Sequence, residues 1–366
     1  MRFSTKKEDI LNELQLLQGI VEKRTTMPIL ANILVDASTD RVNLIGTDLE
    51  VGLKTYFKAD VEEEGSITLS GKKIFEIVKS VPDGKEITFK EKEDLTMEIR
   101  SGKSEFKVLC LPNEDYPQVP EAKFEKKIVI SLDIFKEMID KVYNSITQEQ
   151  RYYLSGALLI LSDNSMELVS TDGHRLAHTS KTIDKMKMDE EIRTIIAKKT
   201  LNEIRKFEGE SVEFDLDDNN LFFKVGKRTL ISRIIEGKFP NFEAVIPKDN
   251  PNILKVSKDE ITNAIRRVSL FSTERSRGIK FNVGKNEINL FSSNPEIGEA
   301  RDKVEADYTG EDVEIGFNSQ YLLDFLSTVK AETIRFELKD TNSSVLMKPD
   351  VEEEIDYVYV LMPMKL

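Results

Sequence analysis

The chain contains only two histidines, His174 and His178, and they are close together in the sequence. Two histidines four residues apart can chelate a metal ion when both lie on one face of a helix. These two follow a strand-like run and a Thr-Asp-Gly turn, so we expect an extended backbone that separates the rings by about 13 Å. With one cysteine in the chain, no zinc site can be assembled. We expect neither a metal nor a cofactor.

Asp172, His174 and Ser180 could suggest a nucleophilic triad, and a hydrolase is therefore the alternative hypothesis. The sequence lacks the G-x-S-x-G elbow that would present the nucleophile, and it also lacks glycine-rich phosphate loops. The acidic runs Glu62–Glu64 and Glu352–Glu354 are consecutive and hairpin-like, so we expect them in solvated loops rather than as ligands of paired metal ions. We expect no catalytic residue and a protein that is not an enzyme.

Composition predicts several globular domains, because 366 residues exceed one typical domain and 39% of them are hydrophobic. Cys110 lies in an apolar run and is expected to be a buried thiol, which suits a reducing compartment. No run approaches the roughly 18 apolar residues of a membrane span, and the N-terminus lacks the apolar core of a signal peptide. We expect a cytoplasmic protein without membrane contact.

A strand that ends in Thr or Ser followed by Asp or Asn occurs three times, as Leu44–Asp48, Leu168–Asp172 and Leu290–Asn294. Thr47 and Thr171 are 124 residues apart, and Thr171 and Ser293 are 122 apart. Spacing this regular indicates an internal repeat of one unit rather than three unrelated α+β domains in tandem.

Each copy contains two amphipathic helices between β-patterned runs, which predicts two helices on one face of an antiparallel sheet. Ser4, Ser131 and Ser257 are the expected N-caps of the opening helices. The opening helices are expected at residues 6–20, 132–146 and 258–271, and the second helices within 67–81, 194–207 and 314–329. Polar stretches after aromatic-plus-proline segments give domain boundaries at 1–121, 122–248 and 249–366.

The net charge of −13 argues against a simple nucleic-acid binder. The second helix is nevertheless basic in the first two copies, where Lys72 and Lys73, then Lys198 and Lys199, begin it. If these helices lined one surface, that surface would attract DNA phosphates without sequence preference while the rest of the molecule repelled DNA. An ordinary solvated helix face remains the alternative on charge alone.

Three segments complete the pattern, namely Arg151–Leu154 (RYYL), Thr171–Leu176 (TDGHRL) and the end of the chain at Tyr359–Leu366 (YVLMPMKL). In this order they resemble the bacterial sliding clamp family, the beta subunit of DNA polymerase III, and the resemblance covers the whole chain. It implies three DNA-clamp domains per chain and a head-to-tail dimeric ring around double-stranded DNA. The implied role is that of a processivity factor, with partners that include the DNA polymerase III alpha subunit, the clamp loader, other polymerases and repair proteins.

The resemblance also implies a pocket between the second and third domains that receives short apolar peptides. An apolar cleft with a few orienting polar groups suits such a ligand. The departures from the family pattern, Ala244, Ser276 and Lys365, bear on which peptides bind. The implied lining is Arg151, Leu154, Thr171, Gly173, His174, Arg175, Leu176, Pro240, Val245, Ser344, Val360, Leu361, Met362, Pro363 and Met364.

Two further sets of residues follow from the resemblance together with the charge pattern. The DNA-facing set has basic, polar and aromatic members: Arg24, Lys72, Lys73, Gln148, Arg151, Tyr152, Tyr153, Lys198 and Lys199. The dimer interface would join an apolar patch and basic groups of one chain to apolar and acidic groups of the other. Its members are Lys72, Arg100, Lys103, Phe106 and Val108 on one side, and Leu270, Phe271, Glu296, Glu299 and Asp302 on the other.

Overall fold

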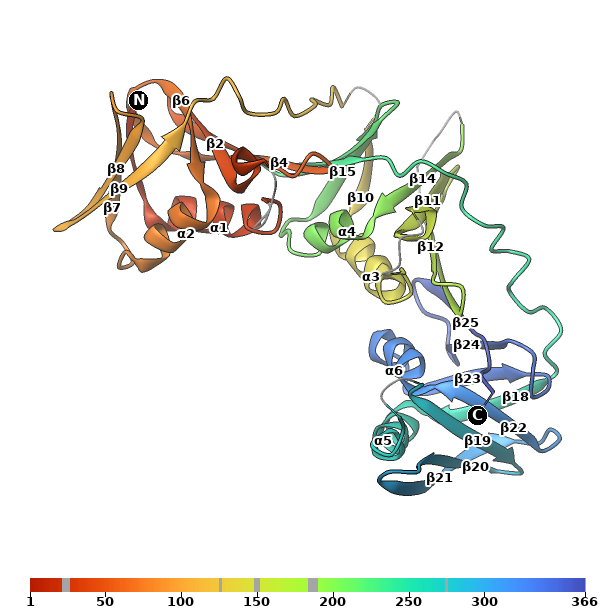
Figure 1. The fold of residues 1–366 in the computed structure, drawn as a ribbon. Coiled ribbons are helices and arrows are strands. Elements are labelled where there is room, and N and C mark those ends of the chain that lie inside the picture. Colours follow the sequence, from red (N-terminus) through yellow and green to blue (C-terminus); the bar gives the residue numbers. More distant parts are fainter. Residues whose placement is uncertain (22–26, 125–126, 148–151, 184–189, 274–275, 366) are drawn as a thin grey trace. The chain divides into compact units, whose positions relative to one another are not determined.

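The computed structural model describes residues 1–21, 27–124, 127–147, 152–183, 190–273 and 276–365 (Figure 1). Two compact units form: residues 1–133 with 199–234, and residues 134–198 with 235–366. The middle third of the chain is therefore shared between the two units. Each of its halves completes the sheet of a neighbouring repeat.

The first unit is built on one 13-stranded sheet. Its order is β10-β15-β16-β17-β4-β3-β2-β6-β9-β8-β7-β1-β5, and α1 packs against α2. The elements are β1 (Arg2–Lys6), α1 (Lys7–Leu17), η1 (Pro28–Ala31), β2 (Asn32–Ser38), β3 (Arg41–Thr47), β4 (Val51–Lys58), β5 (Asp60–Glu63), β6 (Gly65–Ser70), α2 (Gly71–Ser80), β7 (Glu86–Lys92), β8 (Thr96–Ser101), β9 (Ser104–Leu111), β10 (Ile128–Ser131), α4 (Lys198–Ile204), β15 (Ser211–Leu216), β16 (Asn220–Val225) and β17 (Arg228–Arg233).

The second unit contains a 12-stranded sheet, with α5 and α6 packed side by side (Figure 1). The strand order is β14-β11-β12-β13-β25-β24-β23-β18-β21-β20-β19-β22. Its elements are α3 (Leu132–Tyr143), η2 (Tyr152–Leu154), β11 (Gly156–Ser162), β12 (Ser165–Thr171), β13 (Arg175–Thr182), β14 (Ile192–Ala197), β18 (Asn252–Ser257), α5 (Lys258–Ser269), β19 (Gly278–Gly284), β20 (Glu287–Asn294), β21 (Gly298–Tyr308), β22 (Val313–Asn318), α6 (Ser319–Thr328), β23 (Thr333–Leu338), β24 (Val345–Pro349) and β25 (Asp356–Leu361). The described strand pairs of both sheets are antiparallel, as expected.

Every repeat begins with a short strand, which the sequence pattern did not predict, and the expected opening helix follows it directly. In the first repeat Ser4 lies within β1, so its expected role as N-cap is wrong, and the cap position belongs to Lys6. Phe3 of the same strand is buried and stacks on Phe89, with 4.6 Å between ring centroids. Ser257 does cap α5, since its hydroxyl accepts a hydrogen bond from the backbone N–H of Glu260.

The surroundings of Cys110 are as expected, whereas those of Glu353 are not. Cys110 is buried in β9, and burial raises the pKa of its thiol to about 12. Glu353, expected in a solvated loop, instead binds Lys141 at 3.0 Å, and the side chain of Lys141 is completely buried. Within the described residues, no helix is both long and apolar enough to cross a membrane.

Candidate functional site

Some of the predicted pocket residues that the structure describes meet where β13 pairs with β25. Leu176 lies opposite Val360, and Arg175 lies opposite Leu361. Together with Leu154, the side chains of Leu176 and Val360 belong to one buried apolar cluster. We call this place the β13–β25 site. Its floor is apolar because two strands far apart in the sequence bring their hydrophobic residues to one face of the sheet.

The rim of the β13–β25 site is exposed and mixes apolar with polar groups. His174, Pro240, Val245 and Met362 are exposed, and Val245 and Met362 each keep almost half of their surface accessible. Four other residues of the predicted lining are partly buried: Thr171, Ser344, Pro363 and Met364. Exposed apolar side chains above a buried apolar floor are typical of a surface that another apolar group covers.

A tight turn between β12 and β13 forms one wall of the site. The Oδ1 atom of Asp172 accepts hydrogen bonds from the backbone N–H groups of His174 and Arg175, at 2.9 and 3.1 Å. Gly173 has a φ of +89°, which glycine adopts without steric cost. The carbonyl of His174 then accepts a hydrogen bond from the N–H of Met362 at 2.9 Å, so the turn also fixes the end of the chain.

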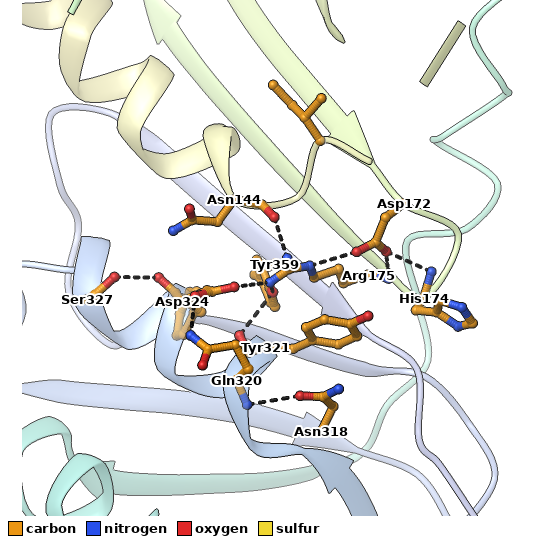
Figure 2. Close-up of polar contacts among 12 residues, drawn as sticks. Asn144, Asp172, His174, Arg175, Asn318, Gln320, Tyr321, Asp324, Ser327 and Tyr359 are labelled. Carbon is orange, nitrogen blue, oxygen red and sulfur yellow. Dashed lines mark hydrogen bonds and ion pairs between the residues drawn. The ribbon is translucent and has the colours of Figure 1, made fainter. Parts of the chain in front are cut away.

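Arg175, expected as a pocket wall, is instead buried beneath the turn, where its guanidinium is fully engaged (Figure 2). It donates to Asp172 at 3.0 Å, to the Tyr359 hydroxyl at 3.2 Å, and to Asp324 and the Asn144 carbonyl. The guanidinium also lies over the Tyr321 ring, 4.1 Å from its centroid. Burial alone would lower the pKa of Arg175, but these acidic and hydroxyl partners raise it, so the residue stays charged.

The same geometry leaves no basis for the hydrolase hypothesis. Both oxygens of Asp172 are committed to the turn and to Arg175. His178 bonds to Glu167 at 2.8 Å, and this hydrogen bond lowers the pKa of the Glu167 carboxyl. Across the described part of the chain, no group of three or more His, Cys, Asp or Glu side chains is arranged to hold a metal ion.

The expected DNA-facing lysines divide into two kinds. Lys72 and Lys73 in α2 are exposed, and both lie near Glu76, at 3.8 and 2.9 Å. Lys198 is half-buried, donates to the Ile146 carbonyl, and has a pKa lowered chiefly by desolvation. Lys199 donates to Asp48 and to the carbonyl of Ile20. The second pair is therefore held by internal bonds that the charge pattern did not reveal.

The other members of the DNA-facing set are less fully described. Tyr153 is 41% exposed, which leaves its ring available to a ligand. Arg24, Gln148 and Arg151, the last of which also belongs to the predicted pocket, lie outside the described residues, as does the side chain of Tyr152.

Residues of the predicted dimer interface come from several elements. Strand β9 carries Phe106 and Val108, β21 carries Glu299 and Asp302, and the others belong to α2, to β8 or to the segments that follow β8, α5 and β20. Val108 points into the core and is only 8% exposed, whereas the neighbouring Leu109 is 81% exposed. Phe106 is partly buried. The β9 side chain that offers most apolar surface is therefore Leu109, which the sequence analysis missed because strand alternation turns adjacent residues to opposite faces.

The remaining interface candidates are mostly polar and exposed. Leu270 is 73% exposed and Phe271 is partly buried. The charged members already have neighbours of opposite charge within the chain: Lys72 with Glu76, Arg100 with Glu98 and Glu105, Glu299 with Arg301, and Asp302 with Arg267. Lys103 and Glu296 are exposed.

Several residues that shape the β13–β25 site were missed. Asn144, Tyr321, Asp324 and Tyr359 surround Arg175, and Asp324 is held in turn by Gln320 at 2.8 Å (Figure 2). Phe239 and Phe242 join the apolar cluster beneath Pro240. The aromatic residues beside this proline were a usable signal, whereas nothing in the local sequence links Asp324 to a residue 149 positions earlier.

Comparison with known proteins gives a consistent result along the whole chain. Residues 1–120, 129–241 and 243–365 match the N-terminal, central and C-terminal domain families of the DNA polymerase III beta subunit. Beta sliding clamps of Pseudomonas putida and Escherichia coli are 33% and 32% identical, with full coverage of both chains.

Solved structures agree with the sequence comparisons. The DNA polymerase III subunit beta of Pseudomonas aeruginosa has a TM-score of 0.94 at 33% identity, and the sliding clamp of Caulobacter crescentus has 0.93 at 32%, each with full coverage of both chains. The fold is therefore three clamp domains of helices and antiparallel sheet. The chain belongs to the DNA polymerase III beta subunit family, the sliding clamps that serve the replicative polymerase as processivity factors and are not its catalytic subunit.

Proposed function

We propose that two copies of this chain close head to tail into a ring around double-stranded DNA in the bacterial cytoplasm. The ring would hold the polymerase by topology rather than by tight, sequence-specific contact. Its partners would be the DNA polymerase III alpha subunit, the clamp loader, other polymerases and repair proteins. Each of the two chains would contribute three domains, at residues 1–121, 122–248 and 249–366, so the ring would have six domains. The full-length match to sliding clamps is the observation that carries this proposal.

The β13–β25 site is the proposed docking place for partner peptides. An extended segment could lay apolar side chains over Leu176 and Val360 while the exposed rim of Val245 and Met362 closed around them. A related clamp from Pseudomonas aeruginosa has been solved bound to griselimycin, which fits a family that accepts ligands. We propose the predicted lining residues as this site, with Arg175 as the residue that supports the wall.

Ring closure is proposed through two strand edges. Residues 104–108 of β9 pair with β8 on one side, and residues 298–305 of β21 pair with β20 on one side. Within the described residues, the opposite edges of these segments have no strand partner. An unpaired edge is a template for another strand. Pairing β9 of one chain with β21 of its partner would bring together the basic and acidic residues predicted for the interface.

The DNA contact would be electrostatic and loose. Lys72 and Lys73 project from α2 into solvent in a chain whose net charge is −13. A local basic surface on an acidic protein concentrates the attraction for phosphate at that surface. Because Lys198 and Lys199 are held internally, we expect them to contribute charge with less freedom to follow the phosphates.

Retention on DNA of defined topology tests the proposal. Before loading, the protein should sediment as a dimer of about twice 41.9 kDa. A clamp loader with ATP then loads it on nicked circular DNA. It should remain on the circle and be released when the circle is cut. Retention that is equal on circular and linear DNA would refute the ring.

The peptide site is tested in the same assay by adding polymerase. Val245→Ser combined with Met362→Ser removes exposed apolar surface from the rim and should abolish polymerase stimulation. Because the clamp loader is also proposed to dock there, loading should fall as well, whereas the dimer measured by sedimentation before loading should be unchanged. Val129→Ser with Val351→Ser is the matched control, since these valines are about equally exposed elsewhere, at 54% and 58%. Stimulation that survives the first pair, or is lost in the second, would contradict the assignment.

A further inference from the structure

A cavity of about 310 Å³ lies in the first unit where β4 pairs with β17, which we call the β4–β17 cavity. This volume is at the small end of the range typical of ligand sites. The lining combines aliphatic and proline residues with a few polar groups. Its members used below are Leu49, Glu50, Gly52, Val119, Ile231 and Arg233.

The turn beside this cavity repeats the turn of the β13–β25 site bond for bond. The Oδ1 atom of Asp48 accepts hydrogen bonds from the backbone N–H groups of Glu50 and Val51, at 2.9 and 2.6 Å. The Oδ1 atom of Asp172 accepts the equivalent bonds, from the residues two and three positions after it. Thr47 Oγ1 donates to the carbonyl of Val51 at 3.1 Å, and the hydroxyl of Thr171 does the same to Arg175 at 2.7 Å. The two turns are copies of one structure.

The strands around the two turns also correspond. Gly52 lies opposite Ile231 as Leu176 lies opposite Val360. The N–H of Arg233 donates to the Glu50 carbonyl at 2.8 Å, and that of Met362 donates to the His174 carbonyl at 2.9 Å. Each of the two sites also has a proline directly after a buried aromatic residue. These are Pro117 after Tyr116 at the β4–β17 cavity, and Pro240 after Phe239 at the β13–β25 site.

One residue differs in a way that points to a ligand. Leu49 has a φ of +78° where the second turn has Gly173 at +89°, and Leu49 remains 50% exposed. A bulky residue is strained at positive φ, whereas glycine is not. Only half of the Leu49 surface is buried within the chain, so burial offsets the strain only in part. Residues strained in this way cluster at functional sites, and Leu49 also lines a cavity.

We infer that the β4–β17 cavity is a second peptide-docking site, for an extended segment with one aliphatic or aromatic anchor. The anchor would rest against Leu49, Val119 and Ile231. The exposed charges of Glu50 and Arg233 would meet polar or charged neighbours in the same segment, which favours an anchor flanked by a serine and an aspartate. The inference rests on the proposed role of the β13–β25 site, whose geometry it shares.

Methyl-selective NMR of the intact protein can test both sites in one titration. The probe is an acetylated and amidated pentapeptide with a central leucine or phenylalanine flanked by serine and aspartate. Saturable shifts at the methyl groups of Leu49, Val119 and Ile231 report on the β4–β17 cavity. Shifts at Leu176 and Val360 report separately on the β13–β25 site, so failure of one proposal is distinguished from failure of the other.

Leu49→Gly relieves the strain and removes the apolar contact, so the affinity reported by Val119 and Ile231 should fall at least about tenfold. The response of Leu176 and Val360 should not change. Leu95→Gly is the matched control, because Leu95 is also exposed, at 45%, also has a positive φ, of +54°, and lies outside the cavity. Absence of saturable shifts at Val119 and Ile231, or an unchanged affinity in Leu49→Gly, would overturn the inference.

Discussion

Arg175 illustrates how one buried side chain can set the shape of a surface site. Its guanidinium joins the 172–174 turn, through Asp172, to α6, through Asp324. The turn then holds Met362 through the carbonyl of His174. A planar guanidinium can bond in several directions and stack on Tyr321 at once, and an ammonium group cannot. The residue therefore positions the site without needing to touch its ligand.

Arg175→Lys should weaken peptide binding at the β13–β25 site by roughly tenfold, about 1.4 kcal/mol, because the turn loses its fixed attachment to α6. Fluorescence anisotropy of a labelled partner peptide measures the affinity. Arg193→Lys, in an exposed ion pair with Glu191, provides the control and should leave the affinity unchanged. A variant that unfolds at lower temperature yet binds the peptide with normal affinity would assign Arg175 to stability alone.

At the residue scale, the sequence could predict side chains whose role is local. Leu176 and Val360 were identified from short motifs and do lie opposite each other on paired strands. The internal bonds of Lys198 and Lys199 were not predictable, because their partners, including Ile146 and Asp48, are distant along the chain. A basic pattern gives the charge of a helix and does not say which charges are already paired.

Sheets that continue across repeat boundaries are the main feature at the scale of elements. β17 of the second repeat pairs with β4 of the first, and β25 of the third pairs with β13 of the second. The repeat itself was predictable, since helices and strands recur at nearly constant spacing. The strands β1, β10 and β18 were not, because runs of four to six residues carry little periodic signal before a strong helix.

A buried ion pair joins α1 to β17 within the first unit. Arg228 donates to both oxygens of Glu13, at 3.0 and 2.8 Å, and the Thr55 hydroxyl adds a third bond at 2.7 Å. Burial of Glu13 by itself would raise the pKa of its carboxyl, but the bonds from Arg228 and Thr55 lower it overall. Lys227 also lies 3.1 Å from Glu13, but its side chain is more exposed than that of Arg228, so Arg228 is the partner on which the buried carboxylate mainly depends.

Arg228→Ala should destabilise the first unit by about 3 kcal/mol, the low end of the range for breaking a buried ion pair, since Glu13 would lose its main partner but keep Lys227. Glu13→Leu with Arg228→Met should recover most of that loss. Urea denaturation followed by a signal from the first unit measures the free energy of unfolding. An equal loss in the single and double variants would show that the side-chain volume, rather than the charge, decides stability.

The contribution of Glu13 to the stability of the first unit depends on pH. Because the folded pKa of Glu13 is below its unfolded value of 4.5, the unfolded chain binds the proton more readily. The contribution of Glu13 is thus complete above that unfolded value and is lost as the pH falls through the lower folded value. The natural chain and the Glu13→Gln variant should therefore differ less in their free energy of unfolding as the pH is lowered.

Assembly is the question at the scale of the whole molecule. Among the residues that the structure describes, β9 and β21 each have a segment of edge without a strand partner, and Leu109 and Leu270 are exposed. A contact between two different faces can close into a ring when the rotation fits, and it then leaves neither edge unpaired. The sequence could suggest the charges at the proposed contact, but burial in the single chain was needed to show that Leu109, rather than Val108, has the exposed apolar side chain on β9.

Charge reversal can test whether these two faces meet. Arg100→Glu with Lys103→Glu should weaken the dimer about tenfold, and so should Glu296→Lys with Glu299→Lys, because each set replaces attraction by repulsion at the rim of the contact. A chain with all four substitutions should dimerise almost normally, since a head-to-tail interface then pairs reversed charges with reversed charges. Lys6→Glu with Lys85→Glu, which alters two exposed lysines of the first repeat, controls for net charge. Sedimentation velocity over a dilution series measures the dissociation constant of the dimer. If the variant with all four substitutions dimerises as weakly as either double variant, the β9 and β21 faces do not bind each other.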